Sequence, residues 1–201
     1  YGIAAIPGEP YTEGTIGAER IEIGILGIGN HRVPNYELPS NIPGLTFTDP
    51  IATAQAYAPG LAEANDAVIA LTHIGFTENP ASVEIDNNVD TYFATQVDGI
   101  DAIVGGHSHT NPSSGFGLYK YLPAIVAGPE NAAVLITQAY RYNSYLGEVI
   151  LGLLPDGSGG YDVVSKAGRY ISIATATYAE DPTVKALITP YSNLLTAYNN
   201  T

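Results

Sequence analysis

Cysteine is absent from the 201 residues, and so are methionine and tryptophan. Without cysteine the chain forms no disulfide and offers no thiolate to a metal ion. The lack of these three residue types, beside 15 tyrosines, is typical of an exported protein. We therefore expect an extracellular or periplasmic location.

Charged residues are also scarce. They make up 13% of the chain, about half the usual share, and 20 acidic residues outnumber 7 basic ones for a formal charge of −13. This balance repels a nucleic-acid backbone, so no nucleic-acid partner is expected. The sequence has no apolar run of 18 residues, and from Tyr1 onward no signal-peptide pattern. We expect a soluble, processed or truncated chain with no membrane partner.

Three short apolar runs, at residues 21–28, 67–71 and 102–104, predict strands buried on both faces. Helix-like stretches at 49–65, with Pro50 in the first turn, and at 86–97 separate them. Because strand and helix alternate, the first half of the chain predicts parallel strands joined by right-handed crossovers.

The second half has a different pattern. After a turn-rich loop at 111–117, strands are predicted at residues 124–127, 133–138, 145–154 and 161–173, with a hairpin turn at 155–160. The antiparallel pattern indicates a mixed sheet system within one α/β domain.

A final helix is predicted from Asp181, as N-cap, and Pro182, as first helical residue. Its apolar residues share one face: Val184, Leu187, Ile188, Tyr191, Leu194, Leu195 and Tyr198. This face packs either on its own domain, which we favour, or on a missing segment or partner subunit.

The chain has four histidines, and each follows a predicted strand: His31, His73, His107 and His109. In open α/β sheets, ligands bind beyond the carboxyl ends of the strands, where residues from distant positions converge. We therefore expect the imidazoles to gather at one edge of the sheet.

Residues 66–73 and 101–107 are near-copies, each an Asp-Ala pair, an apolar strand and a histidine. His109 lies two residues after His107, and in an extended segment such residues point to the same side. Gly105 and Gly106 would let the backbone turn sharply and approach an ion or a phosphate. Imidazoles without thiolates suit Zn, Mn, Co or Fe better than Ca.

A two-metal site normally also needs a bridging carboxylate. Asp66 and Asp101 begin their strands, so we place them at the opposite end of the sheet. Glu78, Asp86 and Asp90 follow the loop of His73, where we expect them to cap the next helix rather than to bind metal.

Three segments resemble, in order and spacing, blocks of the 5′-nucleotidase family of calcineurin-like metallophosphoesterases: ALTHIG at 70–75, GIDAIVGGHSHT at 99–110 and YLGE at 145–148. The resemblance covers about residues 21–173. It implies the C-terminal half of a four-layer α/β/β/α metallophosphoesterase sandwich with mixed sheets. Residues 1–178 would be a partial metallophosphoesterase domain, and 179–201 a linker-like amphipathic helix.

The resemblance also implies a chemistry. In the family, the histidines matching His73, His107 and His109 bind two divalent transition-metal ions, for which we expect Zn or Mn. A metal-activated hydroxide then attacks a small phosphomonoester such as a nucleotide.

The family's Asp-x-His, Gly-Asp and Gly-Asn-His blocks stand upstream of the matched region and are not in this chain. We therefore interpret Gly29-Asn30-His31 as a look-alike of the last block. Asn30, His31, Gly105 and Gly106 are expected near the substrate. No catalytic residue is assigned, and His31 remains a candidate for that role.

Two hypotheses follow. The chain is a fragment of a secreted phosphomonoester hydrolase, active only when an N-terminal half or a neighbouring subunit completes it. Alternatively, it is a catalytically incomplete structural subunit of an extracellular homo-oligomeric or filamentous assembly. Whether these 201 residues alone are an enzyme stays open at this point.

Overall fold

The computed structural model describes residues 20–77, 89–111, 124–129, 132–173 and 178–200. The chain divides into two compact units, one extending to Ile171 and the other covering Ser172–Thr201. The first unit contains the sheets and the first two α-helices, and the second contains the terminal helix.

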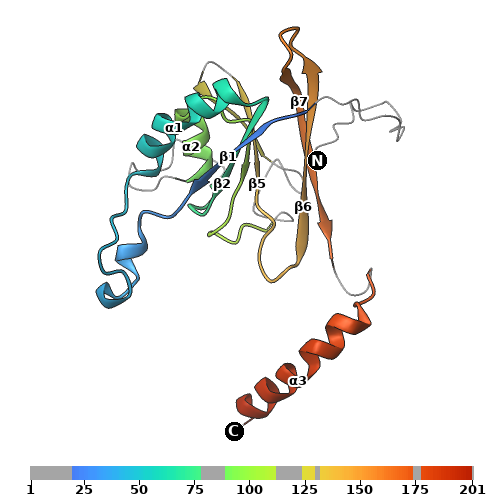
Figure 1. Cartoon of the computed structure of the whole chain (residues 1–201). Helices are drawn as coiled ribbons and strands as arrows, with labels where there is room; N and C mark the ends of the chain where they lie inside the picture. The colour runs from blue at the N-terminus through green and yellow to red at the C-terminus, as the bar shows by residue number, and fades with distance from the viewer. Residues whose placement is uncertain (1–19, 78–88, 112–123, 130–131, 174–177, 201) are drawn as a thin grey trace. The chain divides into compact units, whose positions relative to one another are not determined.

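The first unit is built on a five-stranded sheet of order β1-β2-β3-β5-β4 (Figure 1). Its strands are β1 (Ile23–Ile28), β2 (Ala67–Thr72), β3 (Ala102–Val104), β4 (Ala124–Ala127) and β5 (Ala133–Thr137). Strands β1, β2, β3 and β5 run parallel, and β4 is antiparallel to β5. The predicted mixed α/β fold and the parallel pairing of the first three strands are confirmed.

Helices α1 (Pro50–Ala64) and α2 (Asp90–Gln96) lie on one face of this sheet (Figure 1). Asp49 caps α1, its Oδ1 accepting a 2.8 Å hydrogen bond from the amide of Ala52. The predicted start of α1 is confirmed. Helix α2 begins later than predicted, and residues 86–88 lie outside the described residues.

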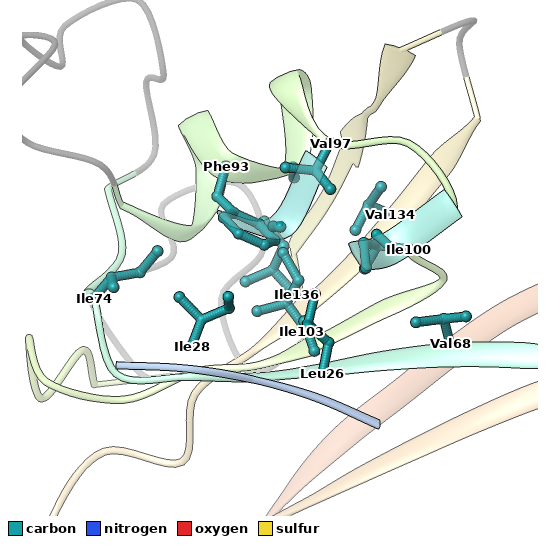
Figure 2. Packing of buried hydrophobic residues seen from close by; sticks show 14 of the residues in the cluster. Leu26, Ile28, Val68, Ile74, Phe93, Val97, Ile100, Ile103, Val134 and Ile136 are labelled. Atoms are coloured by element: carbon teal, nitrogen blue, oxygen red, sulfur yellow. The ribbon is translucent and has the colours of Figure 1, made fainter. Parts of the chain in front are cut away.

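The core lies between these helices and the sheet (Figure 2). Phe93 of α2 is fully buried against apolar side chains that include Ile103 of β3 and Ile136 of β5. Burying each such side chain contributes roughly 1.5–3 kcal/mol, so this layer holds the strands in their order.

The other face of the sheet carries exposed apolar side chains, which we call the open sheet face: Ile23, Ile25, Leu71, Val104 and Ile125, each 39–53% exposed. Leu71 pairs with Val104 in the register, and pairing places residues on the same face. The prediction that the strands are buried on both faces is wrong for β1, which alternates exposed and buried residues. Helices cover only one face in the part of the chain that the structure describes.

Strands β6 (Tyr145–Pro155) and β7 (Tyr161–Ser172) form a separate two-stranded sheet, and the predicted hairpin turn is confirmed. Polar contacts attach this hairpin to the five-stranded sheet. Lys166 Nζ lies 2.9 Å from Asp101 Oδ1, and the amide of Tyr161 donates to Asp66 Oδ1 at 2.8 Å. Asp66 and Asp101 therefore lie at the amino ends of β2 and β3, as predicted, and attach the hairpin there.

The second unit contains helix α3 (Pro182–Asn199). Asp181 Oδ1 accepts hydrogen bonds from the amides of Thr183 (2.8 Å) and Val184 (3.0 Å), which confirms the predicted N-cap. No residue of α3 is buried, and the seven apolar residues of the predicted face are each at least 51% exposed. Among the described helices, none has the length and apolar character needed to cross a membrane.

Candidate functional site

His73 and His107 meet at the carboxyl edge of the five-stranded sheet. His73 directly follows β2, and its amide donates to the Ile28 carbonyl of β1 at 3.0 Å. His107 comes three residues after β3. The two ring centroids are 5.3 Å apart, with the planes inclined at 67°. The predicted strand ends thus place two imidazoles side by side.

The backbone of the histidine-rich loop is bent rather than extended. His107 has φ 77° and His109 has φ 50°, both in the left-handed region. The amide of Ser108 donates to the Gly106 carbonyl at 3.0 Å, which makes His107 the centre of a γ-turn. The prediction of an extended segment is therefore wrong. Such a conformation is costly for a residue other than glycine and persists only when its surroundings impose it.

Gln138, which directly follows β5, contacts this loop with a buried side chain. Its Nε2 donates to the Gly106 carbonyl at 2.9 Å, and its Oε1 accepts a hydrogen bond from the amide of Thr110. The main-chain amide of Gln138 donates to the hydroxyl of Tyr170 in β7 at 3.0 Å. Burial raises the pKa of Tyr170, so its phenol remains neutral.

Gly105 and Gly106 are required by close contacts. A Cβ at Gly105 would lie 2.1 Å from Asp90 Oδ2, and one at Gly106 would lie 2.8 Å from His73 Nδ1. The sharp turn predicted at the glycines falls on His107 instead. The two glycines leave space for a carboxyl and an imidazole at the sheet edge.

Asp90 is fully buried beneath this edge. Its Oδ1 accepts a 2.6 Å hydrogen bond from Thr72 Oγ1, and its Oδ2 has no hydrogen-bond partner within the described part of the chain. Burial raises the pKa of Asp90 to about 7, although the bond from Thr72 acts in the opposite direction. The prediction that Asp90 caps the helix is wrong, because Val89 is the N-cap and makes no side-chain cap. Glu78 and Asp86 lie outside the described residues.

The segment after β1 forms another wall of the site. Asn30 is buried, and its Oδ1 accepts a 2.9 Å hydrogen bond from the amide of Arg32. Nδ1 of His31 is buried and has no hydrogen-bond partner among the described residues. The ring of Tyr36 stacks with that of His107, at a centroid distance of 6.4 Å and an angle of 24°.

The electrostatics of the edge favour a neutral imidazole at His107. Partial burial lowers the pKa of His107 most, and the nearby charges of His73, His109 and Arg32 lower it further. His109 is thus close enough to His107 to lower its pKa, and a neutral imidazole is the form that coordinates metal ions.

The described residues include no group of three histidine, aspartate or glutamate side chains arranged to hold a metal ion. His73 and His107 supply two neighbouring imidazoles, but the buried carboxyl of Asp90 accepts a hydrogen bond from Thr72. Asp66 and Asp101 bind the amides of Glu22 and Val68 at the other end of the sheet. The residues present therefore fit part of a metal site that needs further ligands.

Sequence reasoning missed the roles of Gln138, Asp90 and Tyr36. For Gln138 a signal existed, since a polar residue directly follows the apolar run of β5, as histidine follows β2. For Asp90 and Tyr36 no local pattern indicated a contact with residues 18 or more positions away.

The chain is similar to known 5′-nucleotidases over almost its full length. It is 31% identical to bovine (Bos taurus) 5′-nucleotidase over 196 residues, which cover 94% of this chain and 31% of the relative. It is 30% identical over 198 residues to the snake venom 5′-nucleotidase of Naja atra, covering 95% of this chain and 34% of the relative. No protein-family model matches the chain.

Among solved structures, a 5′-nucleotidase precursor from Thermus thermophilus superposes with a TM-score of 0.66 at 26% identity. The superposition covers 94% of this chain and 34% of that one. The chain thus spans about a third of the length of the relatives it matches.

Proposed function

Because the chain belongs to the 5′-nucleotidase family of calcineurin-like metallophosphoesterases, we propose that it forms the imidazole-bearing part of a phosphomonoester hydrolase. His73, His107 and His109 are the proposed metal ligands. The remaining ligands, including a bridging carboxylate, come from a segment outside these 201 residues or from a neighbouring subunit. These 201 residues alone are proposed to be inactive.

The observation that carries this proposal is the pair of rings 5.3 Å apart, held at the ends of adjacent parallel strands and without a carboxylate ligand among the described residues. Divalent Zn or Mn ions bound there would supply positive charge to the phosphoryl oxygens and lower the pKa of water. Arg32, whose charge already acts on His107, adds positive potential in a chain of charge −13. This local field favours a small phosphomonoester, such as a nucleotide, as substrate.

The open sheet face also supports an incomplete domain. Its five apolar side chains belong to the three parallel strands β1, β2 and β3 and to the antiparallel edge strand β4, and they are 39–53% exposed. Extended apolar surface of this kind marks an interaction site in soluble proteins. A further layer of the same catalytic domain, carrying the carboxylate ligands, is the proposed occupant.

Zinc and manganese binding tests the proposal directly. In calorimetric titrations of the 201-residue chain, Zn²⁺ or Mn²⁺ is expected to bind, and the double substitution His73→Ala/His107→Ala is expected to abolish binding. His31→Ala is the matched control and should bind as the wild type does. Equal binding by all three proteins would contradict the proposed ligand set.

Activity tests the proposed incompleteness. With AMP as substrate and Zn²⁺ or Mn²⁺ present, the chain alone is expected to release no phosphate above the rate of metal ions without protein. Turnover that disappears in His73→Ala would show that the chain is complete by itself.

The location is proposed to be extracellular, in keeping with the composition and with the venom relative's name.

The exposed face of α3 favours a second candidate, a structural subunit of a homo-oligomeric assembly. Leu187, Tyr191 and Leu194 are 68–73% exposed on this face. Under this candidate, the chain associates through α3, and Leu187→Glu/Leu194→Glu returns it to a monomer in light scattering. A monomeric wild-type chain at micromolar concentration would exclude this candidate.

A further inference from the structure

We propose that Gln138 is a positioning residue that holds the loop of His107 and His109 in its bent conformation and, through Ser108, ties it to the loop of His73. The inference rests on the proposed metal-binding function of these histidines. One buried amide directly after β5 would thus orient ligands on two loops.

The Gln138 side chain makes two hydrogen bonds to the main chain of the loop. Nε2 donates to the Gly106 carbonyl at 2.9 Å, and Oε1 accepts from the amide of Thr110. These two hydrogen bonds hold the loop at Gly106, before His107, and at Thr110, after His109. Both left-handed residues are thus enclosed between anchored neighbours.

The hydroxyl of Ser108, the residue between the two histidines, has several polar neighbours. It lies 3.1 Å from Gln138 Nε2 and 3.2 Å from Oε1, and 2.7 Å from Thr110 Oγ1. The same hydroxyl accepts a 3.1 Å hydrogen bond from the amide of Phe76, three residues after His73. Ser108 therefore connects the two histidine loops, with Gln138 fixing its position.

Gln138 is itself held in place by its surroundings. It is 1% exposed, it directly follows β5, and its amide donates to Tyr170 Oη at 3.0 Å. A buried amide with all these partners has one favourable orientation, because turning it by 180° would set its NH₂ group against the Thr110 amide. The side chain can therefore impose a conformation on the loop rather than follow it.

The consequence concerns metal affinity. A γ-turn at a residue other than glycine relaxes when its supports are removed, and His107 would then leave its place beside His73. Removing residues that orient metal ligands typically weakens metal binding 10- to 100-fold.

The test compares Gln138→Met, which keeps the size but loses the hydrogen bonds, with Ile136→Val, a core change two residues earlier, within β5. Co²⁺ is titrated into each full chain and followed by visible absorption, at a temperature where circular dichroism shows all of them folded. Amide hydrogen exchange of Thr110 is measured without metal. Gln138→Met is expected to bind Co²⁺ at least about 10-fold more weakly, and its Thr110 amide is expected to lose its protection from hydrogen exchange. Ile136→Val is expected to keep both the Co²⁺ affinity and the protection of the wild type.

Ser108→Ala gives a second readout. Because Ser108 and Gln138 belong to one network, their effects on Co²⁺ affinity should be markedly less than additive in the double variant. Unchanged Co²⁺ affinity and Thr110 protection in Gln138→Met, or equal losses in Ile136→Val, would overturn the inference. If the wild-type chain binds no Co²⁺, the proposed function fails, and Thr110 protection alone then decides whether Gln138 holds the loop.

Discussion

The Asp90 carboxyl accepts a 2.6 Å hydrogen bond from the hydroxyl of Thr72 within the interior of the protein. Thr72 immediately precedes His73, and the other oxygen of Asp90 lies where Gly105 leaves room for it. The buried acid thus lies against Thr72, the last residue of β2, and Gly105, which follows β3, and a proposed ligand comes after each strand. Its burial has a thermodynamic consequence, because the pKa of Asp90 is raised to about 7.

Asp90→Asn is expected to make the protein more stable at pH 8 and to flatten its stability between pH 4 and 7. In the unfolded chain the carboxyl loses its proton near its ordinary pKa of 3.8, but in the folded chain only near 7. Between these values the folded state binds more protons, so stability falls as pH rises. The free energy of unfolding that is lost in this way reaches its full value above pH 7, and it amounts to at most about 4 kcal/mol. Urea unfolding at pH 4, 6 and 8 measures it.

The control for this prediction is Asp98→Asn, which removes an exposed carboxylate shortly after the same helix. It should leave the pH profile of the wild type unchanged. A stability difference between Asp90→Asn and wild type that is the same at pH 4 and pH 8 would refute the raised pKa.

Gly105→Ala is expected to destabilise the fold by about 1–3 kcal/mol, the usual cost of overpacking. Its Cβ would lie 2.1 Å from Asp90 Oδ2, and Asp90 is too buried to move aside easily. Gly29→Ala is the control, since beyond its two chain neighbours no atom lies within 4 Å of its Cβ position. Asp90→Ala in the same chain should relieve the clash, so the double variant should lose less than the two single losses together in thermal unfolding.

The order of the elements could be predicted from sequence because it depends on local signals. The apolar runs of β2 and β3 and the Asp-Pro starts of α1 and α3 all appear where their patterns place them. The meeting of His73 and His107 followed from one general property, that parallel strands end at a common edge.

The internal arrangement of the site could not be predicted in the same way. The left-handed φ of His107 opposes the residue's own preference and is held by contacts from Gln138, 31 positions later in the chain. The same limit applies to Asp90, whose local position suggested a cap but whose side chain faces Thr72 instead. Tertiary contacts decided both cases, and a single sequence does not reveal them.

Asp66→Ala is expected to cost about 2–4 kcal/mol, because two main-chain amides lose a charged acceptor. Asp66 Oδ2 accepts from the amide of Glu22 at 2.6 Å, and Oδ1 accepts from that of Tyr161 at 2.8 Å. These bonds join the start of β2 to residues beside β1 and at the start of β7. Asp162→Ala, which removes an exposed charge nearby, should change the urea midpoint little. Similar losses of stability in the two variants would mean that the change in net charge, and not the loss of hydrogen bonds, is the cause.

The apolar side chains of the open sheet face should bind an apolar dye without contributing much to the stability of the fold. Ile25→Thr/Leu71→Thr is expected to reduce binding of the dye ANS while leaving the unfolding temperature within a few degrees of wild type. Both side chains are about half exposed, so they contribute little to the core, yet they lie on adjacent strands of one apolar face.

Leu26→Thr provides the contrast, since Leu26 lies on the same strand as Ile25 but faces the helices and is 8% exposed. Its replacement should lower the unfolding temperature strongly, because it removes buried apolar contacts and buries a hydroxyl. If Ile25→Thr/Leu71→Thr destabilised the chain as much as Leu26→Thr, the open sheet face would already be packed within these 201 residues. The face would then not be available to a further layer of the catalytic domain, and the proposal of an incomplete domain would lose its structural support.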